Sequence, residues 1–378
     1  MRRPDAGAAA VPALPGILPA ADLHATARSI VAQQEPSGAI PWFAPTEGVP
    51  GHVDAWNHVE AAMALTVAGL TVPARRAYEW LRTVQRADGS WPAKWVLGEI
   101  TEPGGESNHT AYVAVGVWHE LLVTGDMAFA ERMWPTVRRA IDYVLGLQTA
   151  RGEIIWIRHA GGDLGDHALL TGCSSIYQSL RCAVALGECL GDPQPDWELA
   201  ADQLGHVVAC HQKAFADKSR YSMDWYYPML CGPVRGPAAA LRLTADWDTF
   251  VVDGLGCRCV SDQPWVTGAE TCELVIALHA VGDPRALDLF RIMQHLRHDD
   301  GSYWTGYQFA TDRHFPGDRS TYTAAAVILA ADALTGTTPG ATIFQEIDGI
   351  PLGPCAPADP VACGCEPTPV PGPVRSLG

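Results

Sequence analysis

A short recurring motif restricts the possible folds of this chain more than any other feature. It has the form Q-x-x-x-G-x-x-W with small changes of spacing, and its clear copies begin at Gln34, Gln85, Gln148 and Leu296. Two degenerate copies fall between them, at 217–221 and 260–265. The glycines of the first three copies lie 51 and 63 residues apart. A period this long indicates stacked helix pairs, each too small to bury its own apolar face.

The segments around each motif copy predict one outer and one inner helix. Outer helices are predicted at Ala74–Val84 and Met133–Leu147, and the motif glycine is expected to end each outer helix. The more apolar inner helices are predicted at Ala61–Gly69, Ala111–Leu122, Leu169–Leu190, Asp224–Leu243, Glu273–Val281 and Tyr322–Leu334. Six such pairs close into an all-α (α/α)6 barrel. We interpret the motif as a structural staple, so it indicates the fold and not the function.

The 378 residues divide into three predicted parts. Residues 1–21 are Pro- and Ala-rich and are expected to be a flexible leader, because prolines interrupt any apolar signal stretch. Residues 22–345 form the barrel, and the Pro-, Gly- and Cys-rich residues 346–378 are expected to be mostly disordered. No segment approaches the roughly 18 apolar residues that a membrane helix needs. We therefore expect a cytoplasmic protein.

The cysteines and the net charge exclude several classes of ligand. Most of the eleven cysteines lie in apolar helical segments and are expected to be small buried hydrophobes: Cys173, Cys182, Cys189, Cys210 and Cys272. The CxC pairs at 257/259 and 363/365 lack zinc-site spacing, so we expect no metal and no cofactor. The net charge of −16 argues against nucleic acid or an anionic membrane as partner and fits a neutral substrate.

Two predicted helix starts carry carboxylates that are candidates for catalysis. Asp54 and Asn57 are three residues apart and can share one face of a first turn, although Asp54 also suits an N-cap. Glu270 and Glu273 begin another apolar helix, where a buried glutamate is costly unless it is used or paired. Glycoside hydrolysis needs two carboxyl groups, one protonated and one ionised. We expect Asp54 and Glu270 to be this pair and to oppose each other across the funnel.

Other polar groups at these helix starts have structural interpretations. Glu60 lies deeper and is expected to tie helices together, and Glu273 could pair with Arg258 or Arg319.

Rings beside carboxylates are typical of sugar subsites, in which rings stack on pyranose faces. The expected substrate-binding residues are Trp42, His52, Trp56, Trp91, Glu106, Asn108, Asp224, Tyr226, Tyr227, Trp265, Trp304, Tyr307 and Arg319.

The motif repeats resemble those of terpene cyclases and protein prenyltransferases. That resemblance implies an Asp-x-Asp-Asp acid motif, or a zinc site with a helical partner. The nearest strings here are Asp246-Trp-Asp248-Thr and His298-Asp-Asp300-Gly, and neither fits. No convincing zinc ligand set is present in the sequence either.

A second resemblance covers about residues 14–344. It is carried by the strings at 35–42, 59–65, 170–178, 221–227 and 265–273, which include Tyr-Ser-Met-Asp-Trp-Tyr-Tyr and Trp-Val-Thr-Gly-Ala-Glu-Thr-Cys-Glu. These strings look like those of an actinobacterial (α/α)6 family that includes the methylmannose polysaccharide hydrolases. The resemblance implies an endo-acting, cytosolic hydrolase of partly O-methylated α-1,4-mannan. Two carboxyl groups and a water suffice for that reaction, so we expect no cofactor.

One residue departs from that family's pattern. Where this chain has Asn57, the family often has Asp, in a string like Asp-x-Trp-Asp-His-Val-Glu. An asparagine keeps the shape of an aspartate but cannot act as a base or a nucleophile. The resemblance thus marks position 57 as a site residue and implies impaired activity in this chain.

Three functions remain to be compared. A polysaccharide hydrolase is favoured by the ring-rich loops, the carboxylates and the resemblance. A class II terpene cyclase or prenyl-diphosphate enzyme predicts an acid triad or a basic diphosphate site. A non-catalytic glycan-binding toroid predicts that replacing Asp54 and Glu270 costs nothing beyond stability.

Overall fold

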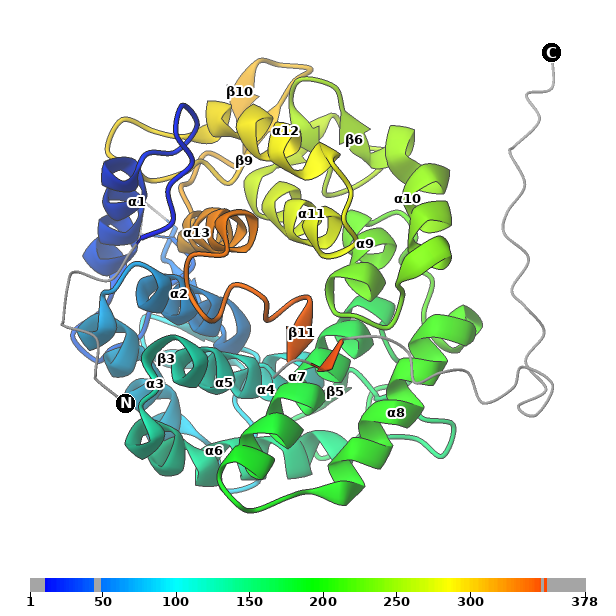
Figure 1. Cartoon of the computed structure of the whole chain (residues 1–378). Coiled ribbons are helices and arrows are strands. Elements are labelled where there is room, and N and C mark those ends of the chain that lie inside the picture. Colours follow the sequence, from blue (N-terminus) through cyan, green and yellow to red (C-terminus); the bar gives the residue numbers. More distant parts are fainter. Residues whose placement is uncertain (1–10, 44–48, 348–349, 352–378) are drawn as a thin grey trace, which may run out of the picture.

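The chain folds into a ring of helices in two layers (Figure 1). The computed structural model describes residues 11–43, 49–347 and 350–351. The inner layer contains α2 (Ala55–Val67), α4 (Ser107–Ala111), α5 (Val113–Thr124), α7 (Leu170–Cys189), α9 (Ser222–Leu230), α11 (Gly268–Ala280) and α13 (Thr321–Thr335). The outer layer contains α1 (Ala20–Gln33), α3 (Thr71–Val84), α6 (Met127–Leu145), α8 (Pro195–Cys210), α10 (Gly236–Phe250) and α12 (Arg285–Ile292), and short 3-10 turns lie at Gln212–Ala214 and Met293–Leu296. The predicted (α/α)6 barrel is confirmed.

Burial separates the two layers. In α11 every residue from Gly268 to Leu278 is buried, whereas α3 buries only Ala74, Ala77, Tyr78 and Leu81. The spacing of three and four in α3 is that of one helix face. Along the inner layer, α2 contacts α5, α5 contacts α7, and α7 contacts α9; α11 then contacts both α9 and α13. Because α13 also contacts α2, the ring is closed.

The glutamine of the motif is a staple between repeats, as the sequence predicts. The Nε2 atom of Gln85 donates to Gly89 O and to Thr136 O on α6, both at 2.9 Å. Gln34 and Gln148 make the same two bonds, each to the glycine carbonyl of its own motif and to the next outer helix. One side chain therefore satisfies two backbone acceptors and sets the spacing of adjacent repeats.

The motif glycine has a different role from the one predicted. Helices α1 and α3 end at the C-caps Gln34 and Gln85, so the expectation that the glycine ends the helix is wrong. Gly89 lies four residues further on with φ +93°, and a Cβ there would be 2.1 Å from Arg139 O on α6. Gly301, in the last copy, meets Ala25 of α1 in the same way. Glycine is needed because the loop approaches the next outer helix, and the last copy closes the ring on the first.

Replacing Gly89 by alanine is expected to lower the free energy of unfolding by about 3 kcal/mol or more. The variant combines a left-handed backbone with a collision against the α6 backbone. Gly98 is the matched control, since it has φ +79° and open space around a Cβ. Its alanine variant should lose about 1 kcal/mol from backbone strain alone. Urea denaturation measures both, and equal losses would contradict the close-approach explanation.

Three predicted boundaries differ in the structure. Residues 14–18 form a turn with a bridge between Leu14 and Leu18, and Leu18 is fully buried, so the barrel begins before residue 22. The range Asp224–Leu243 merges inner helix α9 with outer helix α10, which are separated by a turn containing Gly232 at φ +110°. Beyond residue 345, Glu346–Ile347 (β11) pairs with Ile350–Pro351 (β12). Residues 1–10 and 352–378 lie outside the described residues.

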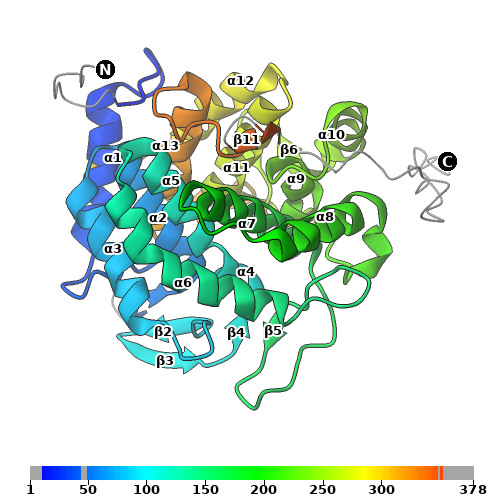
Figure 2. The ribbon, with the colours of Figure 1, turned by 60° about the horizontal axis from the view of Figure 1, so that its bottom comes forward.

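Two kinds of structure cover the two ends of the ring (Figure 2). Hairpins built from β1 (His52–Val53), β2 (Lys94–Val96), β3 (Glu99–Glu102), β4 (Gly105–Glu106) and β5 (Ile157–Arg158) precede inner helices. Further short strands, β6 (Val251–Val252), β7 (Gly256–Cys257), β8 (Trp265–Thr267), β9 (Gly306–Gln308) and β10 (Arg313–His314), lead to α11 and α13. At the opposite end the segment after α13 crosses the centre of the ring and reaches α7 (Figure 1).

That crossing segment is held by two side chains of the barrel. Gln178 Nε2 donates to Ile343 O at 3.1 Å, and Arg235 donates to Phe344 O at 2.9 Å. Phe344 is thereby placed at the base of the central pocket.

The cysteines match the prediction only in part. Cys173, Cys182 and Cys272 are buried, but Cys189 is exposed and Cys210 is half-buried. The second CxC pair, at 363/365, lies outside the described residues.

Among the helices of the described residues, none is long and apolar enough to span a membrane.

Candidate active site

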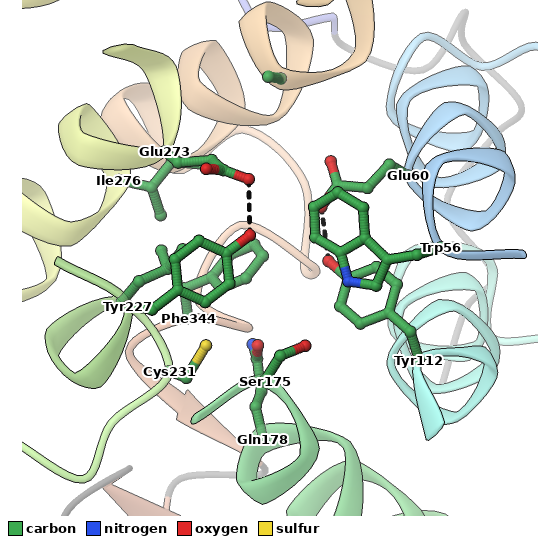
Figure 3. A pocket seen from close by; sticks show the side chains of 12 residues that line it. Trp56, Glu60, Tyr112, Ser175, Gln178, Tyr227, Cys231, Glu273, Ile276 and Phe344 are labelled. Atoms are coloured by element: carbon green, nitrogen blue, oxygen red, sulfur yellow. Dashed lines mark hydrogen bonds between the residues drawn. The ribbon is translucent and has the colours of Figure 1, made fainter. Parts of the chain in front are cut away.

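A pocket lies at the centre of the ring, and it is lined by residues of α2, α7, α9, α11 and α13 and by Tyr112 at the α4–α5 junction (Figure 3). Its walls carry two carboxyl groups, Glu60 from α2 and Glu273 from α11, which face each other in the close-up view. Its other lining residues are Trp56, Tyr112, Ser175, Gln178, Tyr227, Leu230, Cys231, Ile276, Ala326 and Phe344. The pocket therefore joins acidic groups to rings and a polar amide.

Glu273 is held by three tyrosine hydroxyls. Its Oε1 accepts from Tyr227 at 2.8 Å and from Tyr322 at 2.6 Å, and its Oε2 accepts from Tyr226. The expected pairing with Arg258 or Arg319 is wrong, because Arg258 donates to Ser261 O and Arg319 binds Asp300. Both oxygens of Glu273 are engaged and 3% of its surface is exposed, so in this structure it orients the three tyrosine rings. Its catalytic role stays a prediction.

Glu60 ties helices together, as the sequence predicts. Its Oε1 accepts from the hydroxyl of Tyr112, at the α4–α5 junction, at 2.6 Å. Burial raises the pKa of Glu60 to about 7. Burial, together with the charges of Glu60 and Glu270, raises the pKa of Glu273 to about 8, against the opposing effect of its tyrosine donors.

These raised pKa values predict a loss of stability with rising pH. The folded chain keeps protons on Glu60 and Glu273 that the unfolded chain releases above about 4.5. The stabilisation is complete below that pH and is lost as the pH rises through 7 to 8. Glu273→Gln, which carries no titrating proton, should show a smaller fall of Tm between pH 5 and 9. The control is Glu188→Gln, on the exposed side of α7. A slope equal to the parent's would contradict the assignment.

Asp54 caps α2 and holds Asn57. One carboxylate oxygen of Asp54 accepts from Asn57 N at 2.8 Å, and the other accepts from Asn57 Nδ2 at 2.6 Å. His52 Nε2 lies 3.9 Å from the second oxygen. The amide oxygen of Asn57 is buried and has no partner. Asp54 is thus the N-cap of α2, and the amide oxygen of Asn57 remains a free acceptor for a ligand or a water.

Glu270 lies in the first turn of α11 and is 8% exposed. The Cys259 thiol hydrogen-bonds to it, and burial and this carboxylate raise the pKa of the thiol. The sequence treats Cys259 only as half of a CxC pair, so this contact was missed. Helices α2 and α11 both contact α13. Asp54 and Glu270 therefore come from inner helices on either side of α13, the same two helices whose Glu60 and Glu273 face each other in the central pocket. That Asp54 and Glu270 oppose each other across the funnel stays a prediction.

A network of rings joins the start of α2 to Glu273. Trp42 packs against His52 with centroids 4.9 Å apart and against Tyr322 at 6.0 Å. Trp56 packs against Tyr322 at 5.4 Å and against Tyr112 at 4.9 Å. The indole N–H groups of Trp42 and Trp56 are buried without a partner. This wall offers apolar ring surface and two free donors, which suit a sugar.

A second group of rings lies on and beside the β8–β9–β10 sheet. Trp265 packs on Phe315 at 4.3 Å, and Trp304 stacks on His314 at 4.4 Å. Arg319 lies over Trp304, and the Tyr307 hydroxyl donates to Asp312 at 2.8 Å. Four predicted substrate-binding residues are therefore gathered here: Trp265, Trp304, Tyr307 and Arg319.

Other predicted residues lie elsewhere. Trp91 is 1% exposed and donates to Leu81 O at 2.9 Å, so the structure contradicts a substrate-binding role for it. Tyr226 is fully buried on Glu273 and acts through that carboxylate. Asp224 accepts from Thr171 Oγ1 at 2.6 Å. Glu106 and Asn108 line a separate cavity between α4 and α7.

Solved structures share this fold at low sequence identity. A glycosidase solved in complex with glucose matches with a TM-score of 0.65 and 16% identity, over 85% of this chain and 98% of that one. A D-mannose isomerase matches with a TM-score of 0.63 and 11% identity, over 84% and 97%. At these identities the likeness concerns the fold alone. No family model matches the chain.

The solved structures show the (α/α)6 barrel fold, and a relative that matches most of the chain defines the class as a glycoside hydrolase. The terpene-cyclase and binding-toroid alternatives have no such support. The chain belongs to the family of the MMP endo-(1,4)-3-O-methyl-α-D-mannosidase of Mycolicibacterium hassiacum, with which it is 56% identical over 345 residues. The match covers 91% of this chain and 94% of that protein.

Proposed function

We propose that this protein hydrolyses internal bonds of a partly O-methylated, α-1,4-linked mannan. The observation that carries the proposal is the combination of Asp54, Asn57 and Glu270 at two inner-helix starts with an adjoining wall of rings. Buried polar atoms without partners lie in that wall, on Asn57, Trp42 and Trp56. A sugar supplies hydroxyls for such atoms and apolar ring faces for the indoles. The relative's substrate, as its name gives it, has the same chemistry.

The two helix starts have separate roles in the proposed reaction. Glu270 gives its proton to the leaving glycosidic oxygen, as the general acid. Asp54 and position 57 hold the attacking water on the other side of the sugar ring. The free amide oxygen of Asn57 orients this water, and the carboxylate of Asp54 takes its proton. Two carboxyl groups and a water suffice for this chemistry, so the proposal includes no cofactor.

The surroundings suit a neutral, partly methylated polymer. The chain carries a net charge of −16, which would disfavour a phosphorylated substrate. Methoxyl groups donate no hydrogen bond and fit apolar ring surface, which Trp42, Trp56 and Trp265 provide. Within the described residues the thiols of Cys173, Cys182, Cys189, Cys231, Cys257, Cys259 and Cys272 are free, which fits a reducing compartment, and we place the protein in the cytoplasm.

A digestion assay tests this function. The chain and its Asn57→Asp variant are incubated for long times with α-1,4-mannan oligosaccharides, with and without O-methyl groups, and the products are read by mass. We expect internal cleavage of the methylated substrate, with several product lengths from the first time point. An α-1,4-glucan of equal length is the control. If neither form cleaves any of the mannans, the proposed function is wrong.

A further inference from the structure

A second cavity lies between the starts of α4 and α7, and it shares no lining residue with the central pocket. Its volume is about 110 Å³. The side chains that matter here are Glu106 and Asn108 from the start of α4, Thr171 from α7, and the wall formed by Ile154, Trp156 and Leu169. Neither the proposed reaction nor the structural staples use this cavity.

The cavity lies on the same side of the central pocket as the proposed catalytic groups. Asn108 precedes the pocket residue Tyr112 by four positions, and Thr171 precedes the pocket residue Gln178 by seven. On helices these spacings correspond to roughly 6–10 Å toward the helix N-termini. Asp54 and Glu270 also lie at the N-terminal ends of inner helices. Both places therefore lie toward the hairpin end of the ring.

The polar groups of the cavity are suited to hydroxyl donors. The amide oxygen of Asn108 is buried without a partner. The Glu106 carboxylate is partly exposed, and His109 Nε2 lies 3.4 Å from it. Thr171 is already committed, because its hydroxyl donates to Asp224 at 2.6 Å. The cavity thus presents two acceptors and no free cation among its lining residues, which suits a neutral polyol and not an anion.

The opposite wall is apolar and contains one aromatic side chain. Ile154 is fully buried and Leu169 is half-buried, so together they make an apolar wall. The Trp156 ring is stacked on His167 with centroids 5.6 Å apart and an interplanar angle of 23°, and it also contacts His159 at 6.4 Å. A ring fixed by two neighbours gives a binding surface at little entropic cost.

We propose that this cavity is a distal subsite that binds one O-methylated hexose of the polymer, away from the bond that is cleaved. The sugar face contacts Trp156, its free hydroxyls donate to Glu106 and Asn108, and its methoxyl group contacts Ile154 and Leu169. The inference rests on the proposed function and deepens it. A subsite at this distance makes binding depend on the length of the oligosaccharide, which favours cleavage within a chain over trimming at its end.

The test measures binding without cleavage. In a Glu270→Gln background, calorimetry gives dissociation constants for a long and a short methylated oligosaccharide. Trp156→Ala should lower the ratio of long-chain to short-chain affinity about tenfold. Trp156→Phe keeps a ring and should restore most of that ratio. Asn108→Ala removes one acceptor without removing the ring and should lower the ratio a few-fold.

The matched control is Trp247→Ala, which removes a tryptophan from outer helix α10. It should leave the ratio at the parent value. An unchanged ratio in both Trp156→Ala and Asn108→Ala, or an equal loss in Trp247→Ala, would overturn the subsite while leaving the proposed function intact. If the parent neither binds nor cleaves any mannan, both the proposed function and the subsite are wrong.

Discussion

Glu270→Gln is expected to lower the rate of mannan hydrolysis by about 10²- to 10⁴-fold, the range for loss of a general acid. The amide keeps the shape of the side chain at the start of α11 but has no proton to give to the leaving oxygen. The measurement is the initial rate of cleavage of a methylated α-1,4-mannan oligosaccharide by mass-resolved product analysis.

Two comparisons separate loss of the acid from loss of structure. A mannoside with an aryl leaving group needs little protonation, so Glu270→Gln should retain far more of the parent rate on it than on the oligosaccharide. Glu198→Gln removes a carboxylate from the first turn of an outer helix, α8, and controls for the lost charge at a helix start. Equal losses on both substrates would contradict the acid role of Glu270.

Asn57→Asp is expected to raise the rate by a factor on the order of 10² or more, since it adds a carboxylate that can take a proton from water. The Asn57 amide nitrogen lies 2.6 Å from an oxygen of Asp54. Two carboxyl groups that close disfavour each other's ionisation, so one pKa of the variant's pair should rise, and the basicity of that carboxylate with it. As the pH is lowered, the rate of the variant should therefore begin to fall at a higher pH than the rate of the parent. A pH–rate profile of both proteins measures the two effects.

The double variant Asn57→Asp with Glu270→Gln connects the two predictions. The double variant should lose the rate increase of Asn57→Asp, because activation of the water alone does not release a poor leaving group. Asn57→Ala controls for the lost amide and should be slower than the parent. If Asn57→Asp is as slow as the parent, then Asp54 alone is the base and position 57 only orients water.

The layered fold was predictable because its signals are local and repeated. A glutamine four residues before a glycine satisfies nearby carbonyls, and this recurs at each clear copy that begins with glutamine. The reason for the glycine was not predictable, since it depends on the approach of the next outer helix. The merged α9–α10 range shows the same limit. Both segments are apolar enough for a helix, and only their packing assigns them to different layers.

The candidate site was predictable in its residue types but not in its arrangement. Asp54 and Glu270 stand out as carboxylates at helix starts, and the ring-rich strings mark Trp42, Trp56 and Tyr227. The three tyrosines on Glu273 come from two helices, α9 and α13, and no sequence spacing relates Tyr322 to Tyr226. Cys259 beside Glu270 and Trp156 beside Asn108 were missed for the same reason.

The sequence by itself therefore determined the repeat, the two layers and the kinds of side chain at the inner-helix starts, because turns, caps and apolar periodicity act over a few residues. Only the tertiary structure decided that α13 separates the two proposed catalytic helices, that Phe344 is placed at the base of the central pocket, and that a second cavity opens between α4 and α7. Those features depend on how the ring closes, and ring closure joins residues that are hundreds of positions apart in the chain.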